Sequence, residues 1–335
     1  MKNIFCTLFN QSYLVRGLAL YSSMKRCIPG FRLYVLAMDE ETKTALKALN
    51  ADEITVVSIE SVFDEKLKKL LSNRLGASMF WTCTPLIIEH VLTCYYEKWC
   101  TYIDADCFFY GDPCRVFDLI EEAGCSVGIV EHRFRKDESY DEHIKSDGRF
   151  NVAFNVFRNE ENSLKILREW KEQCLEQCTN RPTEGLFGDQ LYLNEWPGKY
   201  RGVYIIEDDG IDVAPWNVNN YRVTKRGDDY WISNDHIDRQ ILMYHFHTLN
   251  HISKHIVSLN LWNTKRRSEI KDLLGLYRDY IDECNRQQVI ASKYVSMTED
   301  AVNTGIGEKI KGFCSKYKNR KENSLVQMFR NVMWI

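Results

Sequence analysis

Residues 99–106 read Trp-Cys-Thr-Tyr-Ile-Asp-Ala-Asp, an apolar run that ends in two aspartates one residue apart. An almost wholly apolar run is typical of a strand buried on both faces of a sheet. Open α/β sheets place their ligand sites at the carboxyl ends of such strands. We therefore expect Asp104 and Asp106 to lie in a functional site at the edge of a mostly parallel sheet.

The residues before this stretch alternate short apolar runs with amphipathic segments, which is the pattern of strand-helix-strand units. Strands are expected at residues 4–9, 31–38, 53–59 and 99–103, and helices at 13–27, 40–49, 63–75 and 81–92. In the last of these helices Pro85 is expected in the first turn, where its missing N–H is tolerated. The pattern predicts an α/β, Rossmann-like fold with a mostly parallel central sheet flanked by helices.

The order of elements changes after Asp106. Strands are expected at residues 126–130, 150–157, 203–206 and 241–246, and helices at 116–123, 163–178 and from 188. Residues 132–149 are polar and without periodicity, so we expect a mobile loop or flap near the site. Residues 1–258 should form the main domain, and residues 259–335 a helical C-terminal extension.

Composition narrows the classes of partner. The chain has 335 residues, of which 44% are hydrophobic and 27% are charged, and a formal net charge of −3. This charge argues against a nucleic-acid partner, which usually binds a basic domain. The sequence contains no stretch of 18 consecutive apolar residues, so it predicts no membrane-spanning helix. The chain opens directly into a short apolar strand rather than a signal peptide, so we expect a cytoplasmic protein with reduced thiols.

The end of the extension is basic and amphipathic, and two interpretations of it remain open. It can lie on the anionic inner face of a membrane as a peripheral contact. It can equally be a solvated helix that packs one face on the core. The basic residues concerned are Lys309, Lys311, Lys316, Lys318, Arg320 and Lys321.

The aspartate pair has a clear chemical use. Two carboxylates where a strand turns out of its extended form can both reach a hard divalent cation, and oxygen ligands suit Mg²⁺ or Mn²⁺. Such an ion stabilises the charge that develops on a leaving diphosphate. Phosphatases of the haloacid dehalogenase type also carry an Asp-x-Asp at a strand end, but there the motif follows the first strand. A phosphate-binding loop of the G-x-x-x-x-G-K-[ST] type is absent from the sequence.

Tyr-Ile-Asp-Ala-Asp at 102–106, followed by Gly-Asp-Pro at 111–113, resembles the core of GT-A-fold glycosyltransferases. The closest pattern is the retaining family-eight group, which includes glycogenin and bacterial lipooligosaccharide galactosyltransferases. Further segments agree with this group in order along residues 1 to about 260. They are the nucleoside-binding segment (6–13), the Phe-Asn-x-Gly strand (150–155), the Asp-Gln helix start (188–194) and the late His-bearing strand (244–247).

The resemblance implies a catalytic domain at residues 1–258 and a set of site residues. The metal ligands would be Asp104, Asp106 and His245, with His247 as the other candidate for the histidine. The residues that would contact the donor are Thr7, Leu8, Phe9, Tyr13, Ala105, Asn151 and His247. Asp189 and Gln190 would face the reacting sugar. Asp189 could also simply cap the helix that it opens.

The resemblance also implies the reaction. The enzyme would transfer a hexose from a nucleotide-sugar donor, most simply a UDP-hexose, with Mn²⁺ or Mg²⁺ as cofactor. The acceptor would be a saccharide or a lipid-linked saccharide in bacterial surface polysaccharide synthesis, and retention of configuration is favoured over inversion. If the enzyme inverts, Asp189 becomes the candidate base for the acceptor hydroxyl. A non-catalytic domain of the same fold that binds nucleotide or glycan remains an alternative.

Three residues add to this site on their own chemistry. Trp216 follows a proline, and the pair offers a rigid apolar wall for a sugar ring. Asn217 could then bond sugar hydroxyls, and Arg74 could contact the diphosphate. Trp216 can equally be a loop residue that fills the edge of the core.

Two departures from the family pattern matter. Ala153 stands where the family has glycine, which narrows the space beside the donor sugar. Thr248 and His251 stand at the glycine and lysine of the family's His-x-x-Gly-x-x-Lys signature, so the diphosphate loses its expected lysine.

Overall fold

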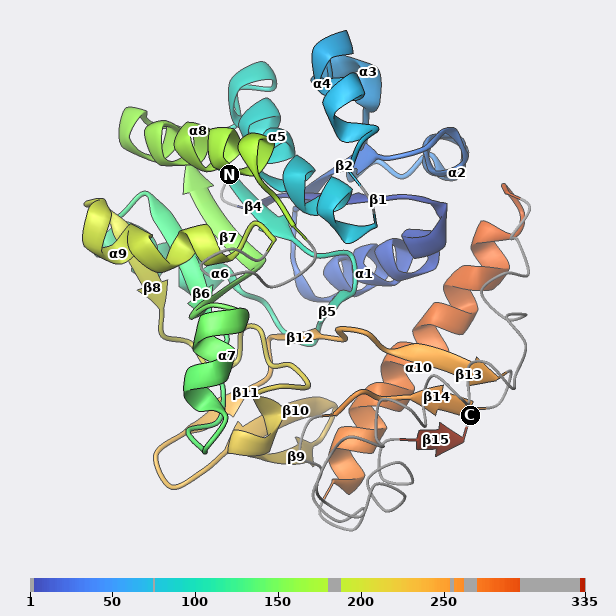
Figure 1. Cartoon of the computed structure of the whole chain (residues 1–335). Helices are drawn as coiled ribbons and strands as arrows, with labels where there is room; N and C mark the ends of the chain where they lie inside the picture. Colours follow the sequence, from blue (N-terminus) through green and yellow to red (C-terminus); the bar gives the residue numbers. More distant parts are fainter. Residues whose placement is uncertain are drawn as a thin grey trace.

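A seven-stranded sheet with the order β3-β2-β1-β4-β7-β6-β8 forms the centre of the molecule (Figure 1). The computed structural model describes residues 3–74, 76–179, 188–253, 256–261, 270–295 and 332–334. Only β7 runs against the other strands of this sheet, because it pairs antiparallel with both β4 and β6. The strands are β1 (Ile4–Phe9), β2 (Arg32–Ala37), β3 (Ile54–Ser58), β4 (Trp99–Ile103), β6 (Val127–Glu131), β7 (Phe150–Arg158) and β8 (Val203–Ile206). The predicted mostly parallel α/β sheet is confirmed.

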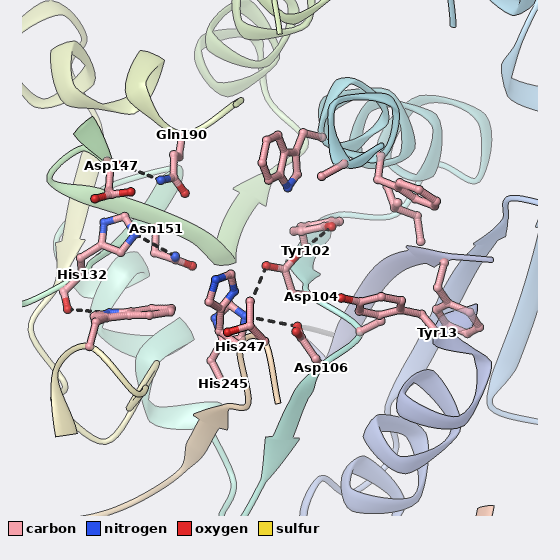
Figure 2. A pocket seen from close by; sticks show the side chains of 18 of the residues that line it. Tyr13, Tyr102, Asp104, Asp106, His132, Asp147, Asn151, Gln190, His245 and His247 are labelled. Carbon is pink, nitrogen blue, oxygen red and sulfur yellow. Dashed lines mark hydrogen bonds and ion pairs between the residues drawn. The ribbon is translucent and has the colours of Figure 1, made fainter. Parts of the chain in front are cut away.

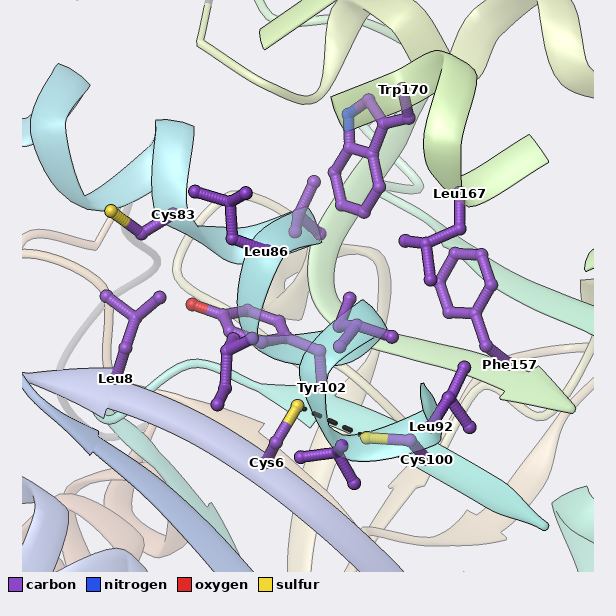
Figure 3. Packing of buried hydrophobic residues seen from close by; sticks show 14 of the residues in the cluster. Cys6, Leu8, Cys83, Leu86, Leu92, Cys100, Tyr102, Phe157, Leu167 and Trp170 are labelled. Atoms are coloured by element: carbon purple, nitrogen blue, oxygen red, sulfur yellow. Dashed lines mark hydrogen bonds between the residues drawn. The ribbon is translucent and has the colours of Figure 1, made fainter. Parts of the chain in front are cut away.

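Helices cover both faces of this sheet, as the alternation of side chains along β1 requires. Cys6 and Leu8 of β1 point into one core, with α5 (Ala77–Cys94) and α8 (Glu161–Glu176) above them (Figure 3). Phe5 and Phe9 point into the opposite core, with α1, α2 and α6. The remaining helices are α1 (Leu14–Cys27), α2 (Glu40–Leu49), α3 (Ile59–Val62), α4 (Glu65–Leu71), α6 (Cys114–Glu122), α7 (Tyr140–Ser146), α9 (Trp196–Lys199) and α10 (Lys271–Ala291).

Asp39 links a helix start to the loop that follows β1. One of its carboxylate oxygens accepts the Thr42 N–H at 2.9 Å and caps α2. The other oxygen accepts the Gln11 N–H at 2.8 Å, at the start of the short 3₁₀ turn Gln11–Tyr13. Since an aspartate at this position satisfies helix N–H groups that would otherwise lack partners, the cap also fixes the loop beside the site.

A two-stranded antiparallel sheet joins a late segment to the aspartate pair. β5 (Cys107–Phe109) follows Asp106 directly and pairs with β12 (Met243–His245), so that His245 lies opposite Cys107. Two further three-stranded sheets are present. One contains β9 (Arg222–Arg226), β10 (Asp229–Ser233) and β11 (Asp238–Gln240). The other contains β13 (Asn250–Ser253), β14 (Ile256–Ser258) and β15 (Val332–Trp334).

A third hydrophobic cluster lies beneath β5 and β12. Phe108 and Phe246 pack against Tyr280 of α10, and Tyr244 bonds Tyr277 of the same helix through their hydroxyl groups at 3.0 Å. α10 also packs along α1. The helix expected in the extension is therefore present, and Figure 1 shows it beside β13, β14 and β15. Within the described residues, no helix combines the length and the apolar character that a membrane span requires.

Several element boundaries differ from the expectations. Residues 132–149 are not a loop throughout, because α7 forms there, with acidic residues in its first turn and basic ones in its last, as the helix dipole favours. Its charges conceal the apolar period, although Tyr140 and Ile144 still pack against Phe134 and Trp216. The helix expected from Trp81 begins at Ala77, so Pro85 lies inside it.

The late strand is shorter than expected, and its partner β5 was not foreseen. The helix expected from residue 188 is a 3₁₀ helix at Leu191–Glu195. At the end of the extension, β15 is a strand where a helix was expected. The lysine-rich stretch from Lys309 to Lys321 lies outside the described residues, so the two interpretations of that tail both stay open.

Candidate functional site

A cavity of about 480 Å³ opens at the carboxyl ends of β1 and β4 (Figure 2). Tyr13 lies on one side of it, the aspartate pair and two histidines lie in the middle, and Gln190 and Asn151 lie on the other side. The cavity brings together most of the residues expected in the site. Those that line it are Leu8, Phe9, Tyr13, Asp104, Ala105, Asp106, Asn151, Gln190, Trp216, His245 and His247.

The aspartate pair faces His245 across the paired strands β5 and β12. The Nε2 atom of His245 lies 3.2 Å from Asp106 Oδ1 and 3.8 Å from Asp104 Oδ2. The Tyr102 hydroxyl donates to Asp104 Oδ1 at 2.9 Å, and the Phe246 N–H donates to the Asp106 carbonyl at 2.9 Å. The strand pairing therefore places a histidine 139 residues downstream of Asp106 against its carboxylate.

These residues suit a divalent cation. Ligand atoms of Asp106, His245 and His247 all lie within 4.8 Å of one another, and Asp104 stands beside this cluster. Carboxylate oxygen and imidazole nitrogen are donors that Mn²⁺ and Mg²⁺ accept in proteins. The side chains of His245 and His247 both face the cavity, with ring centroids 5.5 Å apart.

The charges of this cluster are strongly coupled. Burial alone would lower the pKa of His245, but Asp106 and Asp212 raise it well above its ordinary value. Burial raises the pKa of Asp104 to about 6 against the opposing effect of His245, and Asp106 adds to the rise. Burial also acts to raise the pKa of Asp106, but His245 holds it well below its usual range. The site thus concentrates negative charge that a bound cation can offset.

A chain of hydrogen bonds orders the wall of the cavity opposite Tyr13. The Ala153 N–H donates to Asn151 Oδ1 at 2.7 Å, and Asn151 Nδ2 donates to His132 Nε2 at 3.0 Å. His132 Nδ1–H then donates to the Gly148 carbonyl at 3.0 Å, since a carbonyl can only accept. Burial lowers the pKa of His132 to about 3. His132 is therefore neutral and holds the amide of Asn151 in one orientation.

Two aromatic residues extend this wall. Phe134 stacks on His132 with centroids 4.7 Å apart, and Trp216 meets the same imidazole edge-on at 5.4 Å. The indole N–H of Trp216 donates to the His132 carbonyl at 3.0 Å. The indole is therefore held in one orientation, and only 6% of the surface of Trp216 is exposed.

Four expected site residues do not line the cavity: Thr7, Arg74, Asn217 and Asp189. Thr7 is wholly buried in β1. The guanidinium of Arg74 donates to the carbonyls of Cys174, Leu175 and Cys178 at the end of α8, so it is not directed at a diphosphate. The amide of Asn217 is likewise occupied, because it donates to the His132 and Asp212 carbonyls and accepts the Ala214 N–H.

Asp189 lies behind the cavity rather than in its lining. Its side chain is buried, one carboxylate oxygen has no hydrogen-bond partner among the described residues, and its carbonyl accepts the Trp170 indole N–H at 2.8 Å. Burial raises the pKa of this carboxyl to about 8, with a contribution from Asp104. Gln190 does line the cavity, and its amide nitrogen donates to the Asp147 carbonyl.

Further lining residues were not among the individually predicted contacts, although Asn10 and Ser12 lie within the segment 6–13 that was expected to bind the nucleoside. These further residues are Asn10, Ser12, Ala77, Phe80, Trp81, Tyr102, His132, Phe134, Asp147 and Thr248. His132 and Asp147 bracket the polar stretch that the sequence assigned to a loop. Only their positions in the sequence could have indicated them, because His132 directly follows β6 and Asp147 lies just before β7.

Thr248 shows how the chain accommodates its departure from the family signature. Its φ of 54° is left-handed, a conformation that favours glycine, and the family has glycine at this position. The Asn260 amide donates to the Thr248 hydroxyl, and the Asn250 amide donates to the Thr248 carbonyl at 2.9 Å. The chain therefore adopts a backbone conformation that favours glycine at this position, although the residue is threonine. The side chain of His251, at the lysine position, lies outside what the structure describes.

Sequence comparison finds relatives but no matching family model. The chain is 33% identical over 227 residues to the uncharacterized protein YfnF of Bacillus subtilis (strain 168), across 66% of this chain and 74% of YfnF. It is 27% identical over 245 residues to the uncharacterized protein YfnD of the same organism, across 72% of this chain and 76% of YfnD.

Structure comparison identifies the fold. An active-site mutant of LgtC superposes with a TM-score of 0.52 at 13% identity, covering 89% of this chain and 98% of that one. The apo glycosyltransferase GlyE of Streptococcus pneumoniae TIGR4 gives a TM-score of 0.50 at 13% identity, covering 90% of this chain and 64% of that one. The chain therefore belongs to the family of Bacillus subtilis YfnF, and its fold is the GT-A fold of glycosyltransferases such as LgtC and GlyE.

Proposed function

We propose that this protein is a metal-dependent glycosyltransferase that moves a hexose from a nucleotide-sugar, most simply a UDP-hexose, to a saccharide or lipid-linked saccharide. One observation carries the proposal: Asp104, Asp106 and His245 converge in a cavity at the carboxyl end of β4. The GT-A fold supports it. LgtC is a galactosyltransferase that has been solved in complex with donor and acceptor sugar analogs.

The cavity divides into parts with different chemistry. Asp104, Asp106 and a histidine would hold Mn²⁺ or Mg²⁺, which when bound offsets the charge of the leaving diphosphate. Leu8, Phe9 and Tyr13 would contact the nucleoside on the β1 side. Trp216 and the ordered amide of Asn151 would receive the sugar on the opposite side, where the indole offers an apolar face.

The positions of Asp189 and Gln190 favour retention over inversion. A general base must reach the acceptor hydroxyl and must be ionised at the working pH. Asp189 is buried behind the lining and its pKa is raised to about 8, so it is a poor base for an incoming hydroxyl. Gln190 is the member of the pair that faces the cavity, so we assign it the position beside the reacting sugar.

The alternatives have less support. A haloacid dehalogenase phosphatase would carry its aspartates after the first strand, whereas here they follow β4 in a sheet of the GT-A type. A non-catalytic binding domain would not need a coupled cluster of acidic and imidazole groups inside its cavity. Clusters of groups with strongly shifted pKa values are a mark of functional sites.

A panel of UDP-, GDP- and CMP-sugars, scored by Mn²⁺-dependent donor hydrolysis, tests the proposal. We expect hydrolysis of a UDP-hexose that chelation stops and Mn²⁺ restores. Absence of hydrolysis and of donor binding across the whole panel would refute a nucleotide-sugar transferase. We further propose that the acceptor belongs to bacterial surface polysaccharide synthesis, and that the protein acts in the cytoplasm, with the basic tail as a contact to the inner face of the membrane.

A further inference from the structure

Asp212 lies on the side of the His245 imidazole that faces away from the aspartate pair. We propose that Asp212 is the positioning residue for His245: its carboxylate accepts the Nδ1–H, which leaves the Nε2 lone pair for the cation beside Asp104 and Asp106. The inference rests on the proposed function, because it takes His245 to be a metal ligand. It assigns a role to a residue that the sequence did not single out.

Burial is the first observation behind this assignment. Asp212 is 0% exposed, and among the described residues neither of its carboxylate oxygens has a hydrogen-bond partner. The nearest ion-pair contact joins its Oδ1 to His245 Nδ1 at 3.4 Å, and that nitrogen also lacks a hydrogen-bond partner. A buried carboxylate without a partner is costly. The unpaired atoms of Asp212 and His245 are therefore natural partners for each other. If the distance between Oδ1 and Nδ1 shortens by a few tenths of an ångström, the two atoms form a hydrogen bond.

The backbone around Asp212 holds it in place independently of its side chain. The Leu242 N–H donates to the Gly210 carbonyl at 2.9 Å, the Val213 N–H donates to the Met243 carbonyl at 3.2 Å, and the His245 N–H donates to the Val213 carbonyl at 2.8 Å. The loop 210–213 thus runs along β12 and delivers Asp212 next to His245.

Asp212 itself has a left-handed φ of 55°, which aspartate tolerates better than most residues. Its carbonyl accepts bonds from Arg133 Nη2 at 3.0 Å and from the Asn217 amide at 2.9 Å. These bonds turn the carbonyl toward Arg133 and Asn217. The carboxylate is thereby left to face the imidazole.

Arg133 is the other cation near Asp212, but it already has partners. Its Nη2 atom donates to the Ile211 carbonyl at 2.6 Å, and its Nε atom lies 3.3 Å from Asp209 Oδ1. Among the described residues no hydrogen bond or ion pair joins its guanidinium to the Asp212 carboxylate. The direct ion-pair partner of Arg133 is thus Asp209, which also accepts the Tyr221 hydroxyl at 2.9 Å, while Asp212 acts on Arg133 through its charge without a direct contact between the side chains.

A carboxylate behind a metal-bound imidazole fixes its tautomer and raises its basicity, and removing such a partner typically lowers metal affinity about 10- to 100-fold. We would titrate the whole chain with Mn²⁺ alone and compare wild type with Asp212→Asn and Asp209→Asn. Both variants remove one negative charge from the same loop. We expect Asp212→Asn to weaken Mn²⁺ binding at least about tenfold, and Asp209→Asn to leave it within about twofold.

These outcomes distinguish a failure of the proposed function from a failure of the proposed role of Asp212. Wild type that binds no Mn²⁺ would overturn the metal-dependent function and this inference with it. Wild type that binds Mn²⁺, together with an Asp212→Asn variant that binds it equally well, would overturn the inference alone. Equal losses in both variants would also overturn it, because they would show a general effect of charge. In a His245→Gln background, Asp212→Asn should cause no further loss.

If Asp212→Asn does not fold, the wild-type protein still gives an answer. With ¹⁵N-labelled histidine and saturating Mg²⁺, the His245 signal, assigned by its loss in His245→Gln, should show a proton on Nδ1 and none on Nε2. A His245 protonated on Nε2 in the Mg²⁺-bound protein would contradict the proposal.

Discussion

His132 links three segments of the cavity wall through one neutral imidazole. It receives a hydrogen bond from Asn151 of β7, donates one to Gly148 just before that strand, and stacks on Phe134. The bond from Asn151 requires the uncharged ring, because Nε2 must accept it, whereas Nδ1 can donate in either protonation state. The geometry of this wall of the cavity therefore depends on the protonation state of one residue.

This dependence predicts an acid-sensitive fold. Burial lowers the pKa of His132 to about 3, whereas in the unfolded chain it is near 6.5. Between these values the unfolded state binds more protons, so the free energy of unfolding falls as the pH falls through this window, by up to about 1.4 kcal/mol per pH unit. Thermal unfolding from pH 7 to pH 4 should show this slope in wild type and a shallower one in His132→Gln. Equal slopes would show that His132 is not the group responsible.

Arg74 gives a second prediction at the scale of one residue, and it separates a structural role from binding. Arg74→Met removes three bonds from a guanidinium to carbonyls at the end of α8, so we expect a loss of about 1.5–3 kcal/mol of stability. The matched variant Arg168→Met removes only an exposed ion pair with Glu89 and should cost less than about 1 kcal/mol. Chemical denaturation measures both, and donor affinity should not change in either. A weaker donor affinity in Arg74→Met alone would restore the diphosphate role.

At the scale of elements, the parallel half of the sheet could be predicted because its signals are local. Ile4–Phe9, Glu40–Leu49 and Trp99–Ile103 have the bounds that their apolar periods predict. The pairing of β5 with β12 could not be predicted in the same way. β5 is only three residues long, and its partner lies far along the chain. The sequence indicated that a late histidine joins the aspartates, but only the strand register shows how.

The same distinction between local and long-range signals applies to the residues of the candidate site. Residues that follow a strand directly, such as Asp104 and Asp106, could be placed at the edge of the sheet from their position in the sequence, and both line the cavity. Asn217 and Arg74 were assigned to ligands on the basis of side-chain chemistry, and the structure shows those groups bonded to backbone carbonyls instead. Asp212 could not be predicted in this way, because its position beside His245 depends on a loop lying along β12, which no local pattern indicates.

Gly210 makes that close approach possible, and it yields a prediction for the element. A Cβ at this position would lie 2.2 Å from the Gln240 carbonyl oxygen, which is backbone and cannot move aside easily. Gly210→Ala should therefore push the loop away from β11 and β12, lowering both stability and Mn²⁺ affinity. Gly198→Ala in α9 is the matched control, because its Cβ would meet nothing within 4 Å. Thermal shift and Mn²⁺ titration check both, and a stable, fully binding Gly210→Ala would contradict the argument.

At the scale of the whole molecule, residues 332–334 pair with an earlier strand of the chain. β15 pairs with β14, with Met333 opposite Val257, and Met333 is buried in the third cluster beside α10. This contact joins the last residues of the chain to the segment that follows the histidine strand. The sequence suggested only a helical tail here, because a three-residue strand carries too few residues to show a period.

Removal of residues 332–335 should therefore destabilise the protein. The truncated chain leaves β14 without its outer partner and removes the apolar side chain of Met333, so we expect a lower melting temperature. Met333→Ala should cause part of this loss with the strand intact, by about 2 kcal/mol. Differential scanning calorimetry of both variants provides the measurement. A truncated chain that melts at the wild-type temperature would show that β15 contributes nothing to stability.

The central claim is that Asp104, Asp106 and His245 hold the cation through which a nucleotide diphosphate binds. Its most direct test is calorimetric titration of UDP into wild type and Asp106→Asn, each with Mn²⁺ and with a chelator, and with the exposed Asp141→Asn as the control. We expect wild type and the control to bind UDP only when Mn²⁺ is present, and Asp106→Asn to lose this Mn²⁺-dependent binding. An Asp106→Asn protein that binds UDP with wild-type affinity and wild-type Mn²⁺ dependence would contradict the account.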